Sequence, residues 1–391
     1  MRFLLRLAAT ALAAHCTPQA PLSGQLRQVS SFPSGQVVWL VQPQGFSDIA
    51  ANFTGKIIDS AIVAPDGRFA FAHMPDAAEP TLFQLVVQPR GVRYPNRLHD
   101  EDPLMANYMP FVWKNGEKLS FTADALTFQA SAALQPLNAD NAALVRLRDL
   151  RQDAFKQYKT LVPVDAHDET ALPQAEAAIA QFRHPLMQFA DSCNRLWPAL
   201  VAIRWVSPTG DFERIPEFLA RQCNRWKQQH PHDPRVKTLC ELGDTTKLPL
   251  LTGYTVPDFP LPLRTGDTVG LHRLLGQRLT LLDLWASWCA PCRRENRDVL
   301  VPLWDAFHAR GFQIVGYALD SDHNTWQKAV EKDGAGRWPQ ATHLQGDDAP
   351  LLRALRLTTI PANLLIDAQG KIVAKNLHGD ALRALVEAYL K

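Results

Sequence analysis

The chain has 391 residues, 46% of them hydrophobic, and its 41 Lys and Arg against 39 Asp and Glu leave a net charge of +2. This length is enough for two or three hydrophobic cores. Charges of both signs are scattered along the chain, which excludes the basic surface typical of nucleic-acid binding. We expect three folded modules that act on proteins.

Residues 1–21 have the pattern of an export signal. Arg2 and Arg6 flank the start of an apolar stretch, residues 7–14, in which Ala11 and Ala13 are small residues suited to cleavage. The stretch is too short to span a bilayer. Cys16 partly matches the lipid-attachment site of bacterial lipoproteins, so lipidation, cleavage nearby and an incidental cysteine are three alternatives. Export predicts a periplasmic or cell-envelope location, where disulfides persist.

Residues 22–125 predict a small antiparallel β-domain. Segments rich in β-branched and aromatic residues are strand candidates at 36–41, 56–63, 68–72 and 82–87. Pro65-Asp66-Gly67 predicts a hairpin turn, and Asn115-Gly116 marks another turn. The sequence of this module contains no Gly-rich phosphate loop and no metal-ligand cluster. We therefore assign no catalytic or binding function to residues 22–125.

Residues 126–248 have helical periodicity and predict a helical spacer domain. After a candidate N-cap at Asp140, one helical face carries Leu144, Leu147, Ala154, Phe155 and Tyr158. Cys223 and Cys240 lie on two predicted helices with a turn midway between them, so an antiparallel hairpin would bring them within disulfide distance. Two buried free cysteines are the alternative. Cys193 would remain unpaired.

Residues 249–391 alternate between strands and helices, an order typical of an α/β domain with a mixed sheet. Strands are predicted at 279–284, 312–319, 362–366 and 371–376, the last two forming a hairpin. Helices are predicted at 291–310, 324–332, 351–357 and 380–390. Pro302 lies inside the first of these helices and predicts a kink, because proline lacks a backbone donor.

Two thiols, Cys289 and Cys292, lie three positions apart between an apolar segment and a segment with helical periodicity. At the start of a helix, unpaired N–H groups and the helix dipole favour a thiolate. In such motifs the thiol pKa falls from about 8.5 to between about 3.5 and 7.5. We therefore predict Cys289 as the nucleophile and Cys292 as the resolving cysteine.

Asp283 lies six residues before this pair, among leucines. Burial there would raise its pKa and let it exchange a proton with Cys292. A solvated carboxylate at the strand end is the alternative.

Trp285 is expected to pack in the core and Trp288 to contact a substrate.

The sequence Trp-Ala-Ser-Trp-Cys-Ala-Pro-Cys at 285–292 resembles the active site of the thioredoxin superfamily. Together with Val-Pro-Asp-Phe at 256–259, Asp283, Glu295 and the segment 359–367, it is similar to the TlpA/ResA-like exported thiol-disulfide oxidoreductases. The specific match covers about the last third of the chain. A β-domain and helical segment ahead of it resemble the domain order of Bacteroidetes-type members.

The resemblance implies an α/β thioredoxin-like C-terminal domain with a mixed central sheet flanked by helices. It implies a cis peptide at Ile360-Pro361, where substrate backbone would pair, and substrate contacts at Trp288, Ala290 and Pro291. Glu295 would influence thiol acidity; a first-turn acid that complements the helix dipole is its alternative role. The chain departs from the family pattern at Thr359, where glycine is usual, and at Ala362-Asn363, where Thr-x is frequent.

The expected function is a protein-disulfide reductase that exchanges the Cys289/Cys292 dithiol with disulfides of exported proteins. A membrane thiol-electron donor would reduce the enzyme again, and neither cofactor nor metal is predicted. A thioredoxin-fold peroxidase and a redox-idle binding protein are the alternatives.

Overall fold

The computed structural model describes residues 20–31, 34–162 and 172–391. The predicted export signal up to residue 19, with Cys16, lies outside the described residues. The chain forms two compact units: one comprises the described residues of 1–43 and 52–145, the other those of 44–51 and 146–391. No helix in the described part of the chain is both long and apolar enough to cross a bilayer.

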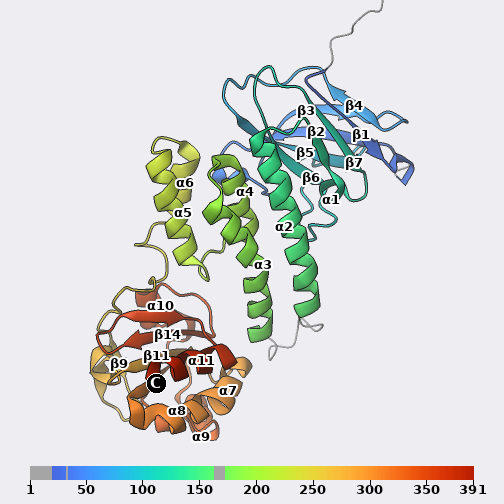
Figure 1. Cartoon of the computed structure of the whole chain (residues 1–391). Helices are drawn as coiled ribbons and strands as arrows, with labels where there is room; N and C mark the ends of the chain where they lie inside the picture. The colour runs from blue at the N-terminus through green and yellow to red at the C-terminus, as the bar shows by residue number, and fades with distance from the viewer. Residues whose placement is uncertain (1–19, 32–33, 163–171) are drawn as a thin grey trace, which may run out of the picture. The chain divides into compact units, whose positions relative to one another are not determined.

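The first unit contains two four-stranded sheets whose apolar faces share one core (Figure 1). Their strands run in the orders β4-β1-β7-β8 and β3-β2-β5-β6. Phe111 and Phe121, one from each sheet, meet edge to face with ring centroids 5.2 Å apart. The elements are β1 Leu22–Arg27, β2 Gln36–Gln42, β3 Lys56–Ile62, β4 Arg68–Phe71, β5 Thr81–Pro89, β6 Tyr108–Trp113, β7 Leu119–Asp124, α1 Phe128–Ser131 and β8 Ala133–Gln135.

The β-domain is present as predicted, but two of its details differ from the expectation. β1 pairs with β7 in parallel, with Leu22 opposite Leu119, so the sheets are not wholly antiparallel. The turn at Gly67 is present, but β3 and β4 belong to different sheets, so it carries the chain between sheets instead of closing a hairpin. Gly67 has φ +84°, and a Cβ there would lie 1.9 Å from the Leu26 carbonyl oxygen, so only glycine fits. The sheet of order β4-β1-β7-β8 also continues past residue 125, the predicted domain boundary, because it includes β8.

The second unit begins with a helical region that includes α3 Leu172–Ser192, α4 Leu196–Val206, α5 Pro216–Gln229 and α6 Pro234–Leu242. Before it, α2, Ala139–Leu161, starts in the first unit and continues into the second. Asn138, not Asp140, caps α2, because its side-chain oxygen accepts the Asn141 N–H at 2.8 Å. Asp140 lies in the first turn.

α4 is apolar nearly all round, and ten of its eleven residues are buried.

Helices α5 and α6 are joined by a disulfide between Cys223 and Cys240, with the Cα atoms 4.8 Å apart. The pairing places this cross-link between neighbouring helices, as the hairpin interpretation predicts. Cys193 is buried and free.

Removing this disulfide is expected to lower the free energy of unfolding by about 3 kcal/mol, because the bridge closes a 17-residue loop in the unfolded chain. The measurement is urea unfolding of a Cys223→Ala/Cys240→Ala variant. Cys193→Ala is the matched control, since it removes a buried cysteine that closes no loop. A loss no larger than that of the control would contradict the prediction.

The second unit ends in a five-stranded mixed sheet of order β13-β12-β11-β14-β15, which confirms the predicted thioredoxin-like architecture (Figure 1). The central strand β11, Leu279–Trp285, is buried at all seven positions, which explains why five of its seven residues are apolar. It pairs in parallel with β12 and antiparallel with β14. The other elements are β9 Pro260–Pro262, β10 Thr268–Gly270, β12 Phe312–Ala318, α9 His323–Lys332, β13 Gln340–Thr342, α10 Pro350–Leu355, β14 Ala362–Asp367, β15 Ile372–Lys375 and α11 Gly379–Leu390. The predicted hairpin is β14–β15.

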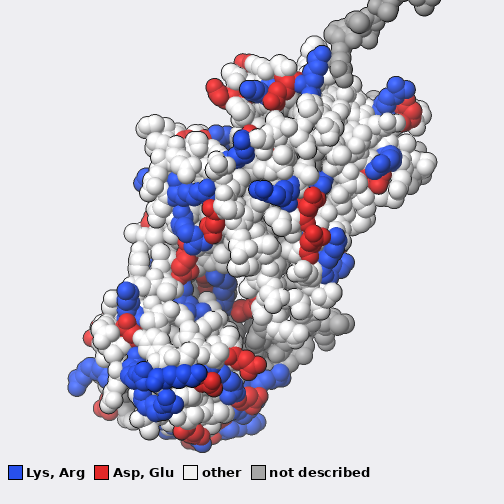
Figure 2. All heavy atoms as spheres, in the orientation of Figure 1, with Lys and Arg blue, Asp and Glu red and all other residues white. Residues whose placement is uncertain are grey.

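The predicted helix at 291–310 is divided. α7, Ala290–Glu295, runs into a π-helical turn at Asn296–Leu300, which α8, Val301–Phe307, follows. The wide turn ends two residues before Pro302, whose missing N–H and bulky ring disturb the preceding hydrogen bonds. On the face shown in Figure 2, acidic and basic side chains are interspersed, in line with the balanced composition.

Candidate redox site

Cys289 and Cys292 are joined by a disulfide where the chain leaves β11 and enters α7. Their Cα atoms are 5.3 Å apart, and the two residues are only 5% and 4% exposed. Cys289 is the N-cap of α7, and its Sγ accepts the Cys292 N–H at 3.3 Å. A thiolate at this position would therefore face a backbone donor and the positive end of the helix.

Side chains on both sides of the cysteines hold the turn. Ser287 donates its N–H to the buried Asp320 at 3.0 Å, and Arg293 donates to the Ser287 carbonyl at 3.1 Å. Trp285 is fully buried and donates its indole N–H to the Gln340 side chain at 3.1 Å. Trp288, in contrast, is 60% exposed. The two tryptophans thus differ as the sequence predicts, one in the core and one at the surface.

The Ile360–Pro361 peptide is cis and immediately precedes β14. The register of β14 with β11 places Ala362 opposite Leu284. Pro361 therefore lies at the same end of the sheet from which the cysteine turn leaves β11. The structure brings together two segments that are about seventy residues apart in the chain.

The helical region contributes two side chains to this cis-proline loop, and we call Glu213 and Arg214 the loop clamp. Glu213 accepts the N–H groups of Thr358 at 3.0 Å and Thr359 at 3.3 Å, together with both threonine hydroxyl groups. Arg214 donates to the Pro361 carbonyl at 3.1 Å and pairs with Glu176 of α3 at 2.9 Å.

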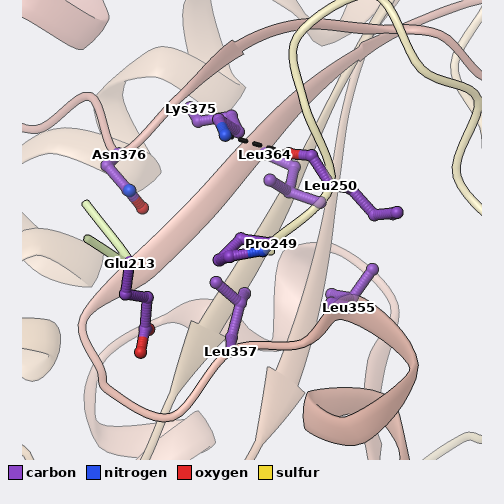
Figure 3. A pocket seen from close by; sticks show the side chains of 8 residues that line it. All are labelled: Glu213, Pro249, Leu250, Leu355, Leu357, Leu364, Lys375 and Asn376. Atoms are coloured by element: carbon purple, nitrogen blue, oxygen red, sulfur yellow. Dashed lines mark hydrogen bonds between the residues drawn. The ribbon is translucent and has the colours of Figure 1, made fainter. Parts of the chain in front are cut away.

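Glu213 also lines a small pocket (Figure 3). Its other walls are mostly apolar and come from the C-terminal domain, as Leu355, Leu357 and Leu364 show. Lys375 closes one side by donating to the Leu250 carbonyl at 2.9 Å. Sequence reasoning missed the clamp, because its partners lie 145 residues away and no local motif joins them.

Glu213→Ala is expected to speed amide hydrogen exchange at Thr358 and Thr359 on the order of tenfold, because it removes the acceptor that holds both N–H groups. Mass spectrometry of the peptide covering the loop measures this exchange. Glu213→Gln is the matched control, since its amide oxygen still accepts hydrogen bonds. Unchanged exchange in the alanine variant would show that the loop holds its own conformation.

Asp283 is a buried carboxyl group in the central strand, 6% exposed, where β11 pairs with Gly316 and Asn363 on its two sides. Burial raises the pKa of Asp283 to about 7, the negative charge of Glu295 adds to this, and His378 opposes it. The solvated alternative for this carboxylate is therefore wrong. A group with this pKa is partly protonated near neutral pH.

Glu295 binds His378, a residue that sequence analysis did not single out. One Glu295 oxygen is 2.6 Å from Nδ1 of His378, and the other accepts the Gly379 N–H at 3.1 Å. Burial by itself would lower the pKa of His378, but the hydrogen bond and charge of Glu295, with the charges of Asp283 and Glu176, raise it. Asp283, Glu295 and His378 thus form one buried charge cluster.

The alternative role of Glu295 as a first-turn acid of its own helix is wrong, because it is the last residue of α7. By accepting the Gly379 N–H it complements the N-terminus of α11 instead. His378 precedes that helix, 83 residues after Glu295, so no spacing rule could have paired them. Among the described residues, no group of three or more His, Cys, Asp or Glu could hold a metal ion.

Comparisons with known proteins identify relatives of the C-terminal domain. The model of the AhpC/TSA family matches residues 252–375. Thiol-disulfide oxidoreductase ResA of Bacillus cereus is 26% identical over 140 residues, which cover 36% of this chain and 76% of that protein. Thiol:disulfide interchange protein DsbE of Yersinia pestis is 31% identical over 124 residues, 31% of this chain and 62% of that protein.

Among solved structures, the thioredoxin domain of a thiol-disulfide oxidoreductase from Bacteroides vulgatus is 32% identical, with 36% of this chain and 99% of that chain covered and a TM-score of 0.34. The family model lies within the C-terminal sheet domain. The C-terminal domain of this chain is a thioredoxin-like domain of the AhpC/TSA family, homologous to thiol-disulfide oxidoreductases of the ResA and DsbE type.

Proposed function

We propose that this chain is an exported protein-disulfide reductase that works through Cys289 and Cys292. The observation that supports this most directly is the Cys289–Cys292 disulfide at the start of α7, at the same end of the sheet as the cis Ile360–Pro361 bond. Homology to thiol-disulfide oxidoreductases supports the same chemistry.

In the reduced protein, the Cys289 thiolate attacks one sulfur of a substrate disulfide. That bond breaks, the second substrate sulfur leaves as a thiolate and takes up a proton, and a mixed disulfide forms. Cys292 then loses its proton and attacks Cys289, which releases the first substrate sulfur. The substrate gains two electrons and two protons, and the protein ends with its own disulfide.

Asp283 is proposed to take up the proton of Cys292 in the second step. A carboxyl group with a pKa of about 7 is both an adequate acceptor and an adequate donor at neutral pH. Glu295 and His378 adjust this pKa in opposite directions, since the first raises it and the second lowers it. They are therefore proposed as positioning residues that act through Asp283.

We place the reaction in the periplasm or cell envelope, with Cys16 as a lipid anchor in one alternative. The export pattern at residues 1–21 supports this. Each turnover leaves the protein oxidised, so a membrane thiol-electron donor is proposed to reduce it again. Substrate contacts are assigned to Trp288, Ala290, Pro291 and the backbone of Ile360.

Peroxide reduction is the second candidate, and the match to the AhpC/TSA family model is what favours it. A peroxidatic cysteine acts as a single activated thiol in a Pro-Thr-Cys setting. Here Trp288 and Ser287 precede Cys289, and Cys292 is bonded to it. The paired arrangement favours disulfide exchange.

The test is reduction of insulin by the full chain with dithiothreitol as electron donor. Turnover above the uncatalysed rate is expected, and Cys289→Ser should lower it to that rate. Cys193→Ala is the control, because this free cysteine lies in the helical region. Peroxide consumption without insulin reduction would favour the second candidate, and neither activity would favour a redox-idle binding protein.

A further inference from the structure

A groove beside the cysteine pair is rich in positive charge. Its walls are Ser287, Trp288 and Ala290 of the active-site turn together with Arg293, Arg294, Arg297 and Lys332. Ala290 lies between the two redox cysteines in the sequence. The groove is therefore lined by both sequence neighbours of Cys289, Trp288 and Ala290.

Two of the four cations are partly neutralised. The buried Asp333 accepts from Nη2 of Arg293 at 2.8 Å and from Nη1 of Arg297 at 2.9 Å. Asp320 is a second buried carboxylate behind the turn, bonded to Ser287. Four cations against these two acids leave an excess of two positive charges.

Arg294 and Lys332 are the two cations of the lining that Asp333 does not hold. Both are exposed, and neither has an ion-pair partner in the ranges that the structure describes. Their charges are thus available to a bound molecule, whereas Arg293 and Arg297 are held by Asp333. Trp288, 60% exposed, adds a large apolar surface to the same groove.

We propose that this groove binds an acidic segment of the substrate next to the disulfide that is reduced. Carboxylates would pair with Arg294 and Lys332, and an apolar side chain would pack on Trp288. A positive groove also raises the association rate of acidic partners. The inference rests on the proposed disulfide exchange and adds a substrate preference to it.

The test uses three peptides, each with one intramolecular disulfide, that differ only in whether the flanking residues are Glu, Gln or Lys. The rate constant for oxidation of the reduced full chain is measured by tryptophan fluorescence. At about 10 mM salt the Glu peptide should react about tenfold faster than the Gln peptide, and the Lys peptide more slowly. At about 1 M salt, where the Debye length is about 3 Å, the ratio should approach one.

In the Arg294→Gln/Lys332→Gln variant, the ratio of Glu to Gln peptide should fall to about one even at low salt. Because the Gln peptide is the reference within each protein, a changed thiol reactivity cancels from this ratio. The matched control is Lys237→Gln/Lys371→Gln, which removes two exposed cations that do not line the groove. Its ratio should equal that of the wild type.

Equal rates for the Glu and Gln peptides would overturn the inference and leave the proposed function intact. A preference that survives in the Arg294/Lys332 variant would overturn the assignment to this groove. If the chain reduces none of the three peptides, both the inference and the proposed function on which it rests are wrong.

Discussion

A Cys292→Ala variant is expected to remain covalently joined to its substrate through Cys289. The first attack needs only the Cys289 thiolate, but release needs a second sulfur held next to it, and the structure places Cys292 at bonding distance. Well-oriented intramolecular groups act with effective molarities of about 10⁵ M or more. Millimolar external thiol therefore cannot replace Cys292, and the mixed disulfide should live at least about a hundredfold longer.

The complex can be recovered from an exported protein fraction and resolved by non-reducing electrophoresis and mass spectrometry. Cys289→Ala/Cys292→Ala is the control, because it lacks both sulfurs and should capture nothing. Capture by a Cys289→Ala single variant, with none by Cys292→Ala, would reverse the assigned order of attack.

Asp283→Asn is expected to slow the resolving step on the order of a hundredfold, because asparagine cannot accept the Cys292 proton. In the wild type this step should accelerate as pH rises through the Asp283 pKa of about 7, where the carboxylate forms. The variant should lose that inflection. Stopped-flow decay of a preformed mixed disulfide across this pH range measures both effects.

The same substitution should stabilise the protein at alkaline pH. The unfolded Asp283 loses its proton near pH 3.8, but the folded one holds it to about pH 7, so wild-type stability falls as pH rises between these values and stays low above them. A shift of about three units corresponds to about 4 kcal/mol. The advantage of Asp283→Asn over the wild type should therefore be larger at pH 8 than at pH 4 by about this amount.

Urea unfolding at the two pH values tests this expectation, with Asp380→Asn as the control because Asp380 is fully exposed in α11. A kinetic change with no pH-dependent gain in stability would mean that Asp283 is ionised in the folded protein. A stability gain with normal resolving kinetics would remove it from the proton transfer.

Features carried by neighbouring residues were predictable. The cysteine pair, the apolar strand β11 and the hairpin β14–β15 each depend on spacings of a few residues, where periodicity and turn chemistry operate. The disulfide of Cys223 and Cys240 was one of two alternatives, because spacing could bring the helices together but could not show that the sulfurs meet.

Features that join distant segments were missed or predicted wrongly. The parallel pairing of β1 with β7 joins residues almost a hundred positions apart, with Leu22 opposite Leu119, and it is the exception in a domain predicted as antiparallel. The pairing of Glu295 with His378 and the contact of Glu213 with Thr358 join residues 83 and 145 positions apart. No local pattern encodes such contacts, since each depends on how whole elements pack.

The linear order of residues was thus sufficient to locate the cysteine pair and the helix that follows it, because a Cys-x-x-Cys segment creates its own N-terminal environment within one turn. It was not sufficient to identify the surroundings that set the reactivity. The raised pKa of Asp283, the clamp on the cis-proline loop and the basic groove all arise when distant segments fold against the site. Burial and charge act through space, and only packing decides which groups are near.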